Sequence, residues 1–144
     1  MHYCTQNDLA LAMSERDLIL LSNDNPKATE VNPVVVEIAI KSSGEIVDGY
    51  LRGRYNLPLQ STPSILKDIT VNLARHWLHA RRVGGAAMPE GVTSTYKTSL
   101  DMLTQIQNGK ITLGLPSGHD APEPGRMRAR AKNPIFGREL LDKF

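Results

Sequence analysis

The chain has 144 residues, of which 40% are hydrophobic, 22% charged and 5% aromatic, and its formal net charge is +2. This length predicts one domain with its own core. The low aromatic content argues against a stacking surface for single-stranded nucleic acid, and the single cysteine, Cys4, excludes an internal disulfide. No stretch is apolar enough to cross a bilayer, and residues 1–4 do not resemble a signal peptide. We therefore expect a single-domain protein suited to a reducing cytoplasm, with no membrane partner.

The charges are distributed unevenly along the chain. Residues 1–49 carry a net charge of −5, residues 50–115 carry +5, and residues 116–144 carry +2. Oppositely charged parts of one small body can attract each other between copies, and such a head-to-tail contact closes into a ring if the rotation permits. The simpler alternative is that both sets of charges only solvate the surface.

Two short helices are predicted at the start of the chain. Thr5 fits an N-cap, with Asp8 at the third helical position, and this helix carries Leu9, Ala10 and Met13 on one side. Ser14 fits a second cap, opening a helix over residues 15–21. Turn-forming residues follow from 22 to 26.

A long helix is predicted from Val34 to about Gly53, because Asn32 and Pro33 form a strong start signal. Its polar stripe is Glu37, Lys41, Glu45, Asp48 and Arg52. Apolar residues lie on both sides of this stripe: Val35, Ile38, Ala39, Ile46 and Tyr50, and then Val36, Ile40, Val47 and Leu51. This pattern is typical of a central helix. Residues 34–36 also fit a strand, but the helical period continues past Gly44.

The clearest helical pattern starts at Thr62-Pro63, after a connector over residues 53–60, and runs to about Arg82 before Gly84-Gly85. One stripe is apolar: Leu66, Ile69, Leu73, Trp77 and Ala80. The opposite stripe is polar: Asp68, Asn72, Arg75, His79 and Arg82. We predict that this helix and the helix from Pro33 are the two longest, with Leu73 and Trp77 in the core between them.

A last helix is predicted from near Thr93 to Gly109, and its apolar face holds Tyr96, Leu100, Leu103 and Ile106. Residues 110–115 then alternate as a short strand would, with no evident partner in the chain. The predicted fold is all-α, a compact bundle of four or five helices with this short strand-like segment and an extended C-terminal arm.

The predicted arm comprises residues 116–144, and residues 1–115 form the predicted body. Residues 116–133 are rich in proline and glycine and nearly lack large apolar side chains, so they cannot form a core. Four basic residues follow one another at a spacing of two: Arg126, Arg128, Arg130 and Lys132. The end is apolar again and holds the residues predicted as anchors on a partner: Ile135, Phe136, Leu140, Leu141 and Phe144.

The sequence contains no motif for nucleotide binding or for a nucleophilic serine. Cys4 lies near a predicted helix start, which would lower its pKa, but a buried or idle thiol is the stronger interpretation. His76 and His79 lie three apart without a third ligand at a suitable spacing, and Arg75 and Arg82 would repel a metal ion. We expect no catalytic site, no metal and no cofactor.

Basic residues are the strongest functional signal that remains. The helix face with Arg75, His79 and Arg82, together with Arg52 and Arg54 before it, suits DNA phosphates, as does the basic arm. The same residues suit an acidic protein surface, or only solvation. Nonspecific binding of nucleic acid is therefore the main alternative to a protein that assembles with copies of itself.

The order of motifs resembles that of a known family. Residues 3–9 match the pattern Tyr-x-Thr-x-x-Asp-Leu, and residues 45–59 match Glu-Ile-x-x-Gly-Tyr-Leu-x-x-Arg-Tyr-x-Leu-Pro-Leu. A proline-initiated helix with Ala74-Arg75 follows, and then Tyr96, Leu100, Leu103, Ile106, Gly109 and Leu113 at the expected spacing. The chain thus resembles the head–tail adaptor (neck, or connector) proteins of Mu-like bacteriophages and prophages. Thr95 departs from the arginine expected there.

The resemblance implies a non-enzymatic subunit of the phage neck, assembled in the host cytoplasm and located in the virion. The implied partners are the portal protein, copies of the chain in a ring of twelve, the next neck or tail-terminator protein, and the DNA passing through the channel. The arm is the expected portal-binding element. The expected interface or channel-facing residues are Arg52, Arg54, Tyr55, Arg75, His79 and Arg82.

Overall fold

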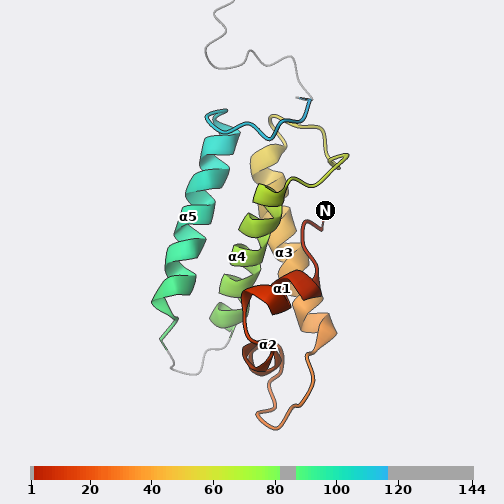
Figure 1. The fold of residues 1–144 in the computed structure, drawn as a ribbon, viewed down its shortest axis with the longest axis vertical. Helices are drawn as coiled ribbons and strands as arrows, with labels where there is room; N and C mark the ends of the chain where they lie inside the picture. The colour runs from red at the N-terminus through yellow and green to blue at the C-terminus, as the bar shows by residue number, and fades with distance from the viewer. Residues whose placement is uncertain (1, 82–86, 117–144) are drawn as a thin grey trace, which may run out of the picture.

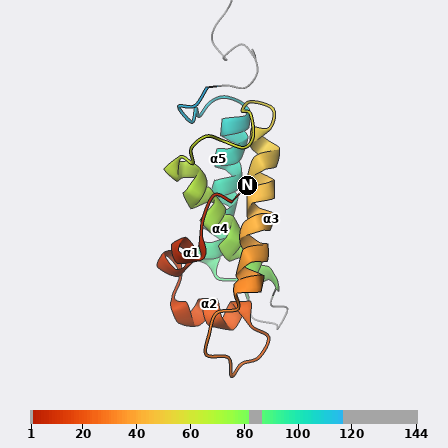
Figure 2. The same ribbon diagram turned by 90° about the vertical axis from the view of Figure 1, so that its right-hand side faces the viewer.

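The structure is a computed structural model that describes residues 2–81 and 87–116. These residues form five helices and no strand: α1 (Gln6–Ala12), α2 (Glu15–Ser22), α3 (Pro33–Leu51), α4 (Ser64–Arg81) and α5 (Glu90–Gln107). The three long helices run along the long axis, and α4 contacts both α3 and α5 (Figure 1). The short helices α1 and α2 pack against one half of the α3–α4 pair (Figure 2). The predicted all-α bundle is confirmed.

Side-chain caps fix the first three helix starts where the sequence predicts them. The Thr5 amide donates to Asp8 Oδ2 (2.8 Å), and the Asp8 amide donates to Thr5 Oγ1 (3.4 Å), so each end of this capping box satisfies the other. Ser14 caps α2 through its hydroxyl. Asn32 caps α3, with Pro33 in the first turn, where its missing N–H costs nothing.

The two later helices begin at other positions than predicted. The carbonyl of Pro63 accepts the first helical hydrogen bonds of α4, one residue beyond the predicted cap Thr62. Helix α5 begins at Glu90, three residues before Thr93. With that extra turn α5 has 18 residues, as many as α4, against 19 for α3. The prediction that the helices from Pro33 and Pro63 are the longest is therefore correct only for the first.

Helix α5 ends at a glycine, as predicted. Gly109 has φ +78°, a conformation that other residues rarely adopt. The Gly109 amide donates to the Ile106 carbonyl (3.1 Å), and the Lys110 amide donates to the Gln105 carbonyl (2.9 Å). These two bonds form a Schellman motif, which satisfies carbonyls at the helix end and turns the chain back.

Replacing Gly109 by alanine is expected to lower the free energy of unfolding by about 1–2 kcal/mol. The positive φ is unfavourable for alanine, and a Cβ at this position would lie 2.2–2.8 Å from the Arg54 guanidinium. Chemical denaturation of the two chains measures the difference. Gly91→Ala is the matched control, because a Cβ there meets nothing within 4 Å. Equal effects at both positions would contradict this account.

The predicted strand over residues 110–115 is wrong. Its alternating apolar residues instead fold over the end of the bundle, where Ile111, Leu113 and Leu115 pack against the core. The Leu113 amide donates to the Tyr55 hydroxyl (3.1 Å). A side chain therefore satisfies this backbone donor, and no neighbouring strand is needed. The alternation of apolar and other residues therefore reflects a segment that packs one side on the ends of the helices, not a strand.

The core consists of two clusters that share α3 and α4. The α5 cluster joins the long helices and the connector after α3; its members are Tyr3, Val47, Leu51, Tyr55, Leu59, Leu66, Ile69, Leu73, Leu103 and Ile106. The α1–α2 cluster fixes the short helices on the α3–α4 pair; its members are Cys4, Leu9, Leu18, Val36, Ala39, Ile40, Val71, Ala74 and Leu78. No described residue of α5 belongs to the second cluster.

The buried face of α4 is broader than predicted and shifted. Leu66, Ile69 and Leu73 are buried as expected, but Ala80 is exposed and Trp77 is only half-buried. Leu78 takes the place predicted for Trp77. The reason is that α4 has neighbours on several sides, α3, α5 and the short helices, so an arc rather than a single stripe is buried. A full core cost for Trp77→Ala is therefore no longer expected.

One residue of the polar stripe predicted on α3 lies inside the bundle. Asp48 is only 9% exposed and accepts a hydrogen bond from the Tyr3 hydroxyl. Burial, and then this carboxylate, raise the pKa of Tyr3 above its usual range. The segment before α1 is thereby tied to α3, a contact that helical spacing alone does not reveal.

Candidate interaction surfaces

The outer face of α3 carries an apolar row that no described element covers. Val34, Ile38 and Ile46 are 65%, 47% and 41% exposed. They lie four residues apart, or multiples of four, in the row Val34, Ile38, Ser42, Ile46 and Tyr50, which we call the α3 ridge. Rows at this spacing are the ridges with which helices pack into one another. The sequence predicts a helix apolar over most of its circumference. The structure buries the side with Val36, Ile40, Val47 and Leu51. On the other side it buries Ala39 but leaves Ile38 and Ile46 exposed.

Charges of alternating sign run beside the α3 ridge. Glu37, Lys41 and Glu45 are exposed and also lie four residues apart. At the end of this face, Glu45 and Gln107 line a shallow hollow with Ile46, Gly49 and Tyr50. A Cβ at Gly49 would meet nothing within 4 Å, so the surface is open at this position. This face of α3 therefore combines apolar area with polar margins.

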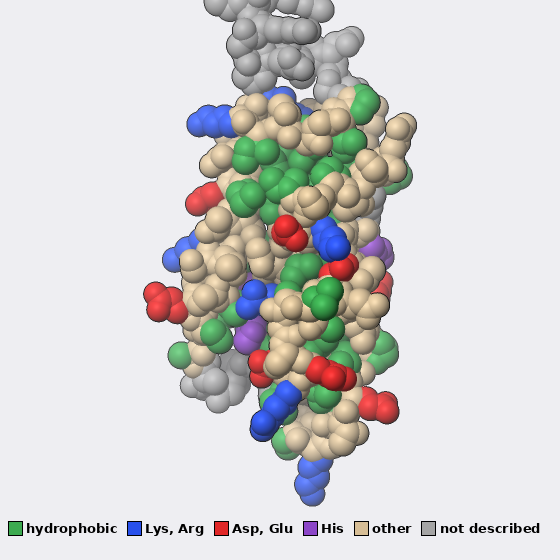
Figure 3. Space-filling view, viewed as in Figure 1, with side chains coloured by type: hydrophobic (Ala, Val, Ile, Leu, Met, Phe, Trp, Pro, Cys, Tyr) green, Lys and Arg blue, Asp and Glu red, His purple; other side chains and the backbone are tan. Residues whose placement is uncertain are grey.

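A groove separates α4 from α5 on the other side of the molecule. It is lined by Ser64, Ile65, Asp68, Ile69 and Asn72 of α4 and by Thr95, Thr98, Ser99 and Met102 of α5. Small side chains on α5 leave this space open, and the Asn72 amide donates to the Ser99 hydroxyl (3.2 Å) across it. Figure 3 shows hydrophobic side chains gathered where α4 begins and α5 ends, among charges of both signs. We call this the α4–α5 groove.

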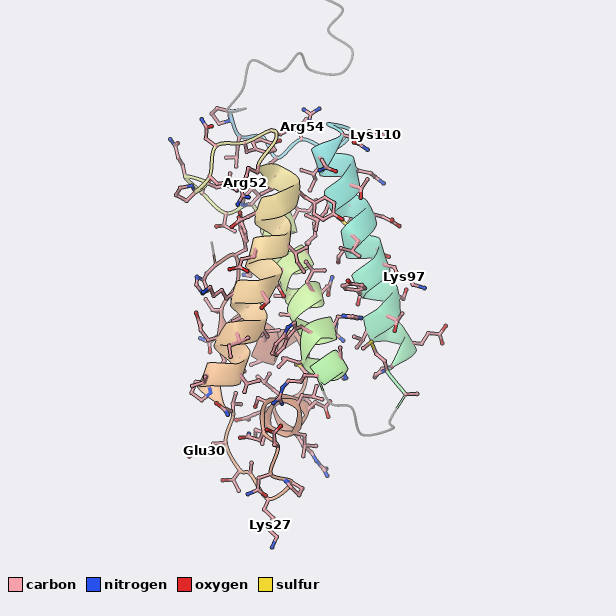
Figure 4. All side chains as sticks on the ribbon, turned by 180° about the vertical axis from the view of Figure 1, so that it is seen from behind. Lys27, Glu30, Arg52, Arg54, Lys97 and Lys110 are labelled. Carbon is pink, nitrogen blue, oxygen red and sulfur yellow. The ribbon has the colours of Figure 1, made fainter. Side chains whose placement is uncertain are left out.

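Three residues predicted as an interface or as facing a channel lie at the end of the bundle where α3 and α5 terminate. Arg52 is exposed there, beside the end of α3 (Figure 4). Arg54 is engaged within the chain, because its Nε donates to the Gln107 carbonyl (2.8 Å) at the end of α5. Tyr55 is buried, with 6% of its surface exposed, which corrects its expected place on a surface. Of these three, only Arg52 is free to meet a partner.

The polar stripe predicted on α4 lies partly against α5, since its Asn72 donates to Ser99 of α5. His76, outside the predicted stripe, stacks on Tyr96, with ring centroids 3.7 Å apart. Arg75 is half-buried, and its Nε is the one buried side-chain atom without a hydrogen-bond partner among the described residues. His79 is also half-buried, while Arg82 lies outside the described residues. The structure thus brings Arg75 and His79 to one place on α4, away from Arg52 and Arg54.

Acidification is expected to weaken folding through these histidines. Burial lowers the pKa of His76 below its ordinary value of 6.5, and burial followed by the Arg75 charge lowers that of His79. The unfolded chain then binds protons first as the pH falls through 6.5, so stability falls below that pH. Thermal unfolding between pH 7 and pH 5 measures this decline. It should be smaller in a His76→Gln/His79→Gln double variant, and an equal decline would exclude these groups as its source.

Metal and thiol chemistry have little support in the described part of the chain. Residues 2–81 and 87–116 contain no group of three His, Cys, Asp or Glu side chains able to hold a metal ion. Cys4 is buried, and burial raises the pKa of its thiol to about 12. A lowering of the pKa by the helix start, the weaker of the two interpretations, is excluded because desolvation dominates, and the interpretation as a buried thiol is confirmed. None of the helices within these residues is long and apolar enough to cross a membrane.

The residues of the predicted arm do not belong to the described part of the chain, apart from Pro116. Residues 117–144 lie outside the described part of the structure, and with them all nine proposed arm contacts: Arg126, Arg128, Arg130, Lys132, Ile135, Phe136, Leu140, Leu141 and Phe144. Their role stays a prediction. The α3 ridge was not predicted as a separate surface, although apolar residues on each side of the polar stripe indicated it.

Comparison with known proteins identifies the family. A family model described as Bacteriophage Mu, Gp36 matches residues 3–131, so the chain belongs to this family of Mu-like phage proteins. Gene product J of Escherichia phage Mu is 28% identical over 141 residues, which cover 96% of each chain. The Mu-like prophage FluMu protein gp36 of Haemophilus influenzae is 29% identical over 121 residues, covering 83% of this chain and 82% of that protein.

Proposed function

We propose that this protein is a structural subunit of the phage neck, forming a ring beneath the portal that joins the DNA-filled head to the tail and extends the DNA channel. The observation that carries the proposal is similarity to Mu-like phage proteins along nearly the whole chain. This similarity agrees with the motif resemblance to head–tail adaptors. The role is structural, without a catalytic step or a cofactor.

The surfaces of the helical body support a role in assembly. A subunit of a closed ring needs two different faces, one for each neighbour. The α3 ridge and the α4–α5 groove would serve as two such faces, because each combines apolar area with charged residues. The two faces are joined through α3 and α4, which contribute to both core clusters.

The proposed partners follow from this role. They are the portal protein, neighbouring copies in a ring of twelve, the next neck or tail-terminator protein, and the DNA in the channel. Residues 116–144 would bind the portal, with the basic residues facing acidic groups and the apolar end filling pockets. The protein would be assembled in the host cytoplasm and become part of the virion.

The nucleic-acid-binding alternative receives less support from the basic residues that the structure describes. Arg54 donates to a main-chain carbonyl, and Arg81 donates to the Leu21 carbonyl (2.7 Å) and pairs with Asp24 (2.9 Å). Arg75 is half-buried. Few of the predicted basic residues therefore remain free for phosphates on the described surface.

The proposal is tested with heads assembled in the absence of this protein. Purified full-length chain is added to DNA-filled heads, and the portal vertex is imaged by cryo-electron microscopy. We expect an added ring at that vertex and restored tail attachment. Heads that gain no density would contradict the proposal. Binding to free duplex DNA that weakens steeply with salt, without binding to heads, would favour the alternative.

A further inference from the structure

The α3 ridge and the α4–α5 groove face opposite sides of the molecule. In Figure 1 the beginning of α4 lies in front of α3, and in Figure 4, seen from behind, α3 is nearest to the viewer. Figure 2 places them at opposite edges. A single chain therefore cannot fill its own groove with its own ridge, whereas two copies placed side by side can bring one against the other.

We propose that the lateral contact between subunits packs the α3 ridge of one copy into the α4–α5 groove of the next. This inference rests on the proposed ring function and names the surfaces that would form the ring. Such a contact is heterologous, because it uses the ridge of one copy and the groove of the other. In a pair, one copy therefore still has an unused groove and the other an unused ridge, and a further copy can bind to either.

The shape of the two surfaces supports this assignment. The α3 ridge is a straight row at four-residue spacing, in which Ser42 is small and Ile38 and Ile46 protrude. The groove has apolar walls from Ile65 and Met102, both half-buried, and small residues along α5. A row of protruding side chains at this spacing can pack into a groove between side chains of other helices. Val34, Ile38 and Ile46 also form a row, whereas the exposed apolar residues of an ordinary protein surface are scattered singly.

One charge at each surface is complementary to a charge at the other. Lys41 is exposed beside the α3 ridge, whereas the neighbouring Glu37 is engaged by His2 within the chain. Asp68 is exposed and is the one charged residue among those that line the groove. A ridge seated in the groove of another copy can then bring Lys41 close to Asp68. Charges at the rim in this arrangement set register and discourage wrong partners.

The first test measures self-association of the full-length chain by sedimentation velocity over a wide range of protein concentration. The Ile38→Asp/Ile46→Asp double variant is expected to associate roughly 100-fold more weakly, because it loses the apolar ridge and places charge in the groove. Leu11→Asp is the matched control: Leu11 is 88% exposed on α1, outside both surfaces, and its variant should associate normally. A chain that stays monomeric throughout, or a double variant that associates normally, would overturn the assignment.

The second test decides whether the contact is heterologous. Ile65→Asp/Met102→Asp alters only the groove and should also abolish self-association. Mixing this groove variant with the ridge variant leaves one intact ridge and one intact groove, so a one-to-one dimer should form and grow no further. If the mixture stays monomeric, the ridge pairs with another ridge or with something else, and the proposed contact is wrong. Circular dichroism checks that each variant is folded.

Failure of this inference is distinguishable from failure of the neck function. Binding of each chain to DNA-filled heads is measured separately from self-association. If the protein binds heads but its ridge variant still forms normal rings, the proposed contact is wrong and the proposed function stands. If the protein associates through the ridge but does not bind heads, the proposed function is wrong and the proposed contact stands.

Discussion

Replacing Leu73 by alanine is expected to lower the free energy of unfolding by about 2–5 kcal/mol. Leu73 is 2% exposed in the α5 cluster and lies on α4, which contacts both other long helices. Removing its side chain forfeits burial and leaves a cavity that three rigid helices cannot easily close. Urea denaturation, followed by circular dichroism, measures the change.

The matched control for this core substitution is Leu11→Ala. It removes the same atoms from a side chain that is 88% exposed, so the stability should change by no more than about 0.5 kcal/mol. A similar loss at both positions would mean that burial in the α5 cluster does not govern stability. It would also call into question the packing of α4 between α3 and α5.

Truncating the chain after Leu115 is expected to leave folding intact and to abolish attachment to DNA-filled heads. Both core clusters lie within residues 3–106, and Leu115 still packs against the α5 cluster. The removed segment is poor in large apolar residues up to residue 133 and should add little to stability. Thermal unfolding and cosedimentation with heads are the two measurements.

A full-length control separates the anchoring role of the arm from its length. Phe136→Ala/Phe144→Ala keeps every basic residue of the arm and removes only its two aromatic side chains. We expect it to fold normally and to bind heads more weakly than the unaltered chain. If the truncated chain binds heads as well as the full chain does, the arm is not the anchor, and surfaces of the helical body must make the contact.

Local signals predicted the starts of the first three helices. Caps at Thr5, Ser14 and Asn32 act through hydrogen bonds within three residues, and the end of α5 depends on the φ angle of Gly109 and on hydrogen bonds to the last turn. Periodicity likewise predicted Leu66, Ile69 and Leu73 in the core. Such features are determined by neighbours along the chain, so no knowledge of tertiary structure is needed to find them.

Features that depend on which helix lies beside which were predicted poorly. The polar stripe of α4 was expected opposite the buried face, but α5 lies against part of it, where the Asn72 amide donates to the Ser99 hydroxyl. Asp48 was assigned to a solvent-exposed stripe and instead meets Tyr3, 45 residues away. Likewise, two apolar sides of α3 were visible in the sequence, but periodicity does not say which of them the rest of the chain buries.

The division of the core into two clusters has a consequence for how the bundle opens. Helix α5 is attached through one cluster and the α1–α2 pair through the other, and only α3 and α4 belong to both. Either edge can therefore detach while the opposite edge remains packed. Backbone amides in the middle of α3 and α4 should exchange with deuterium only on global unfolding, whereas those of α1, α2 and α5 exchange through smaller, separate openings.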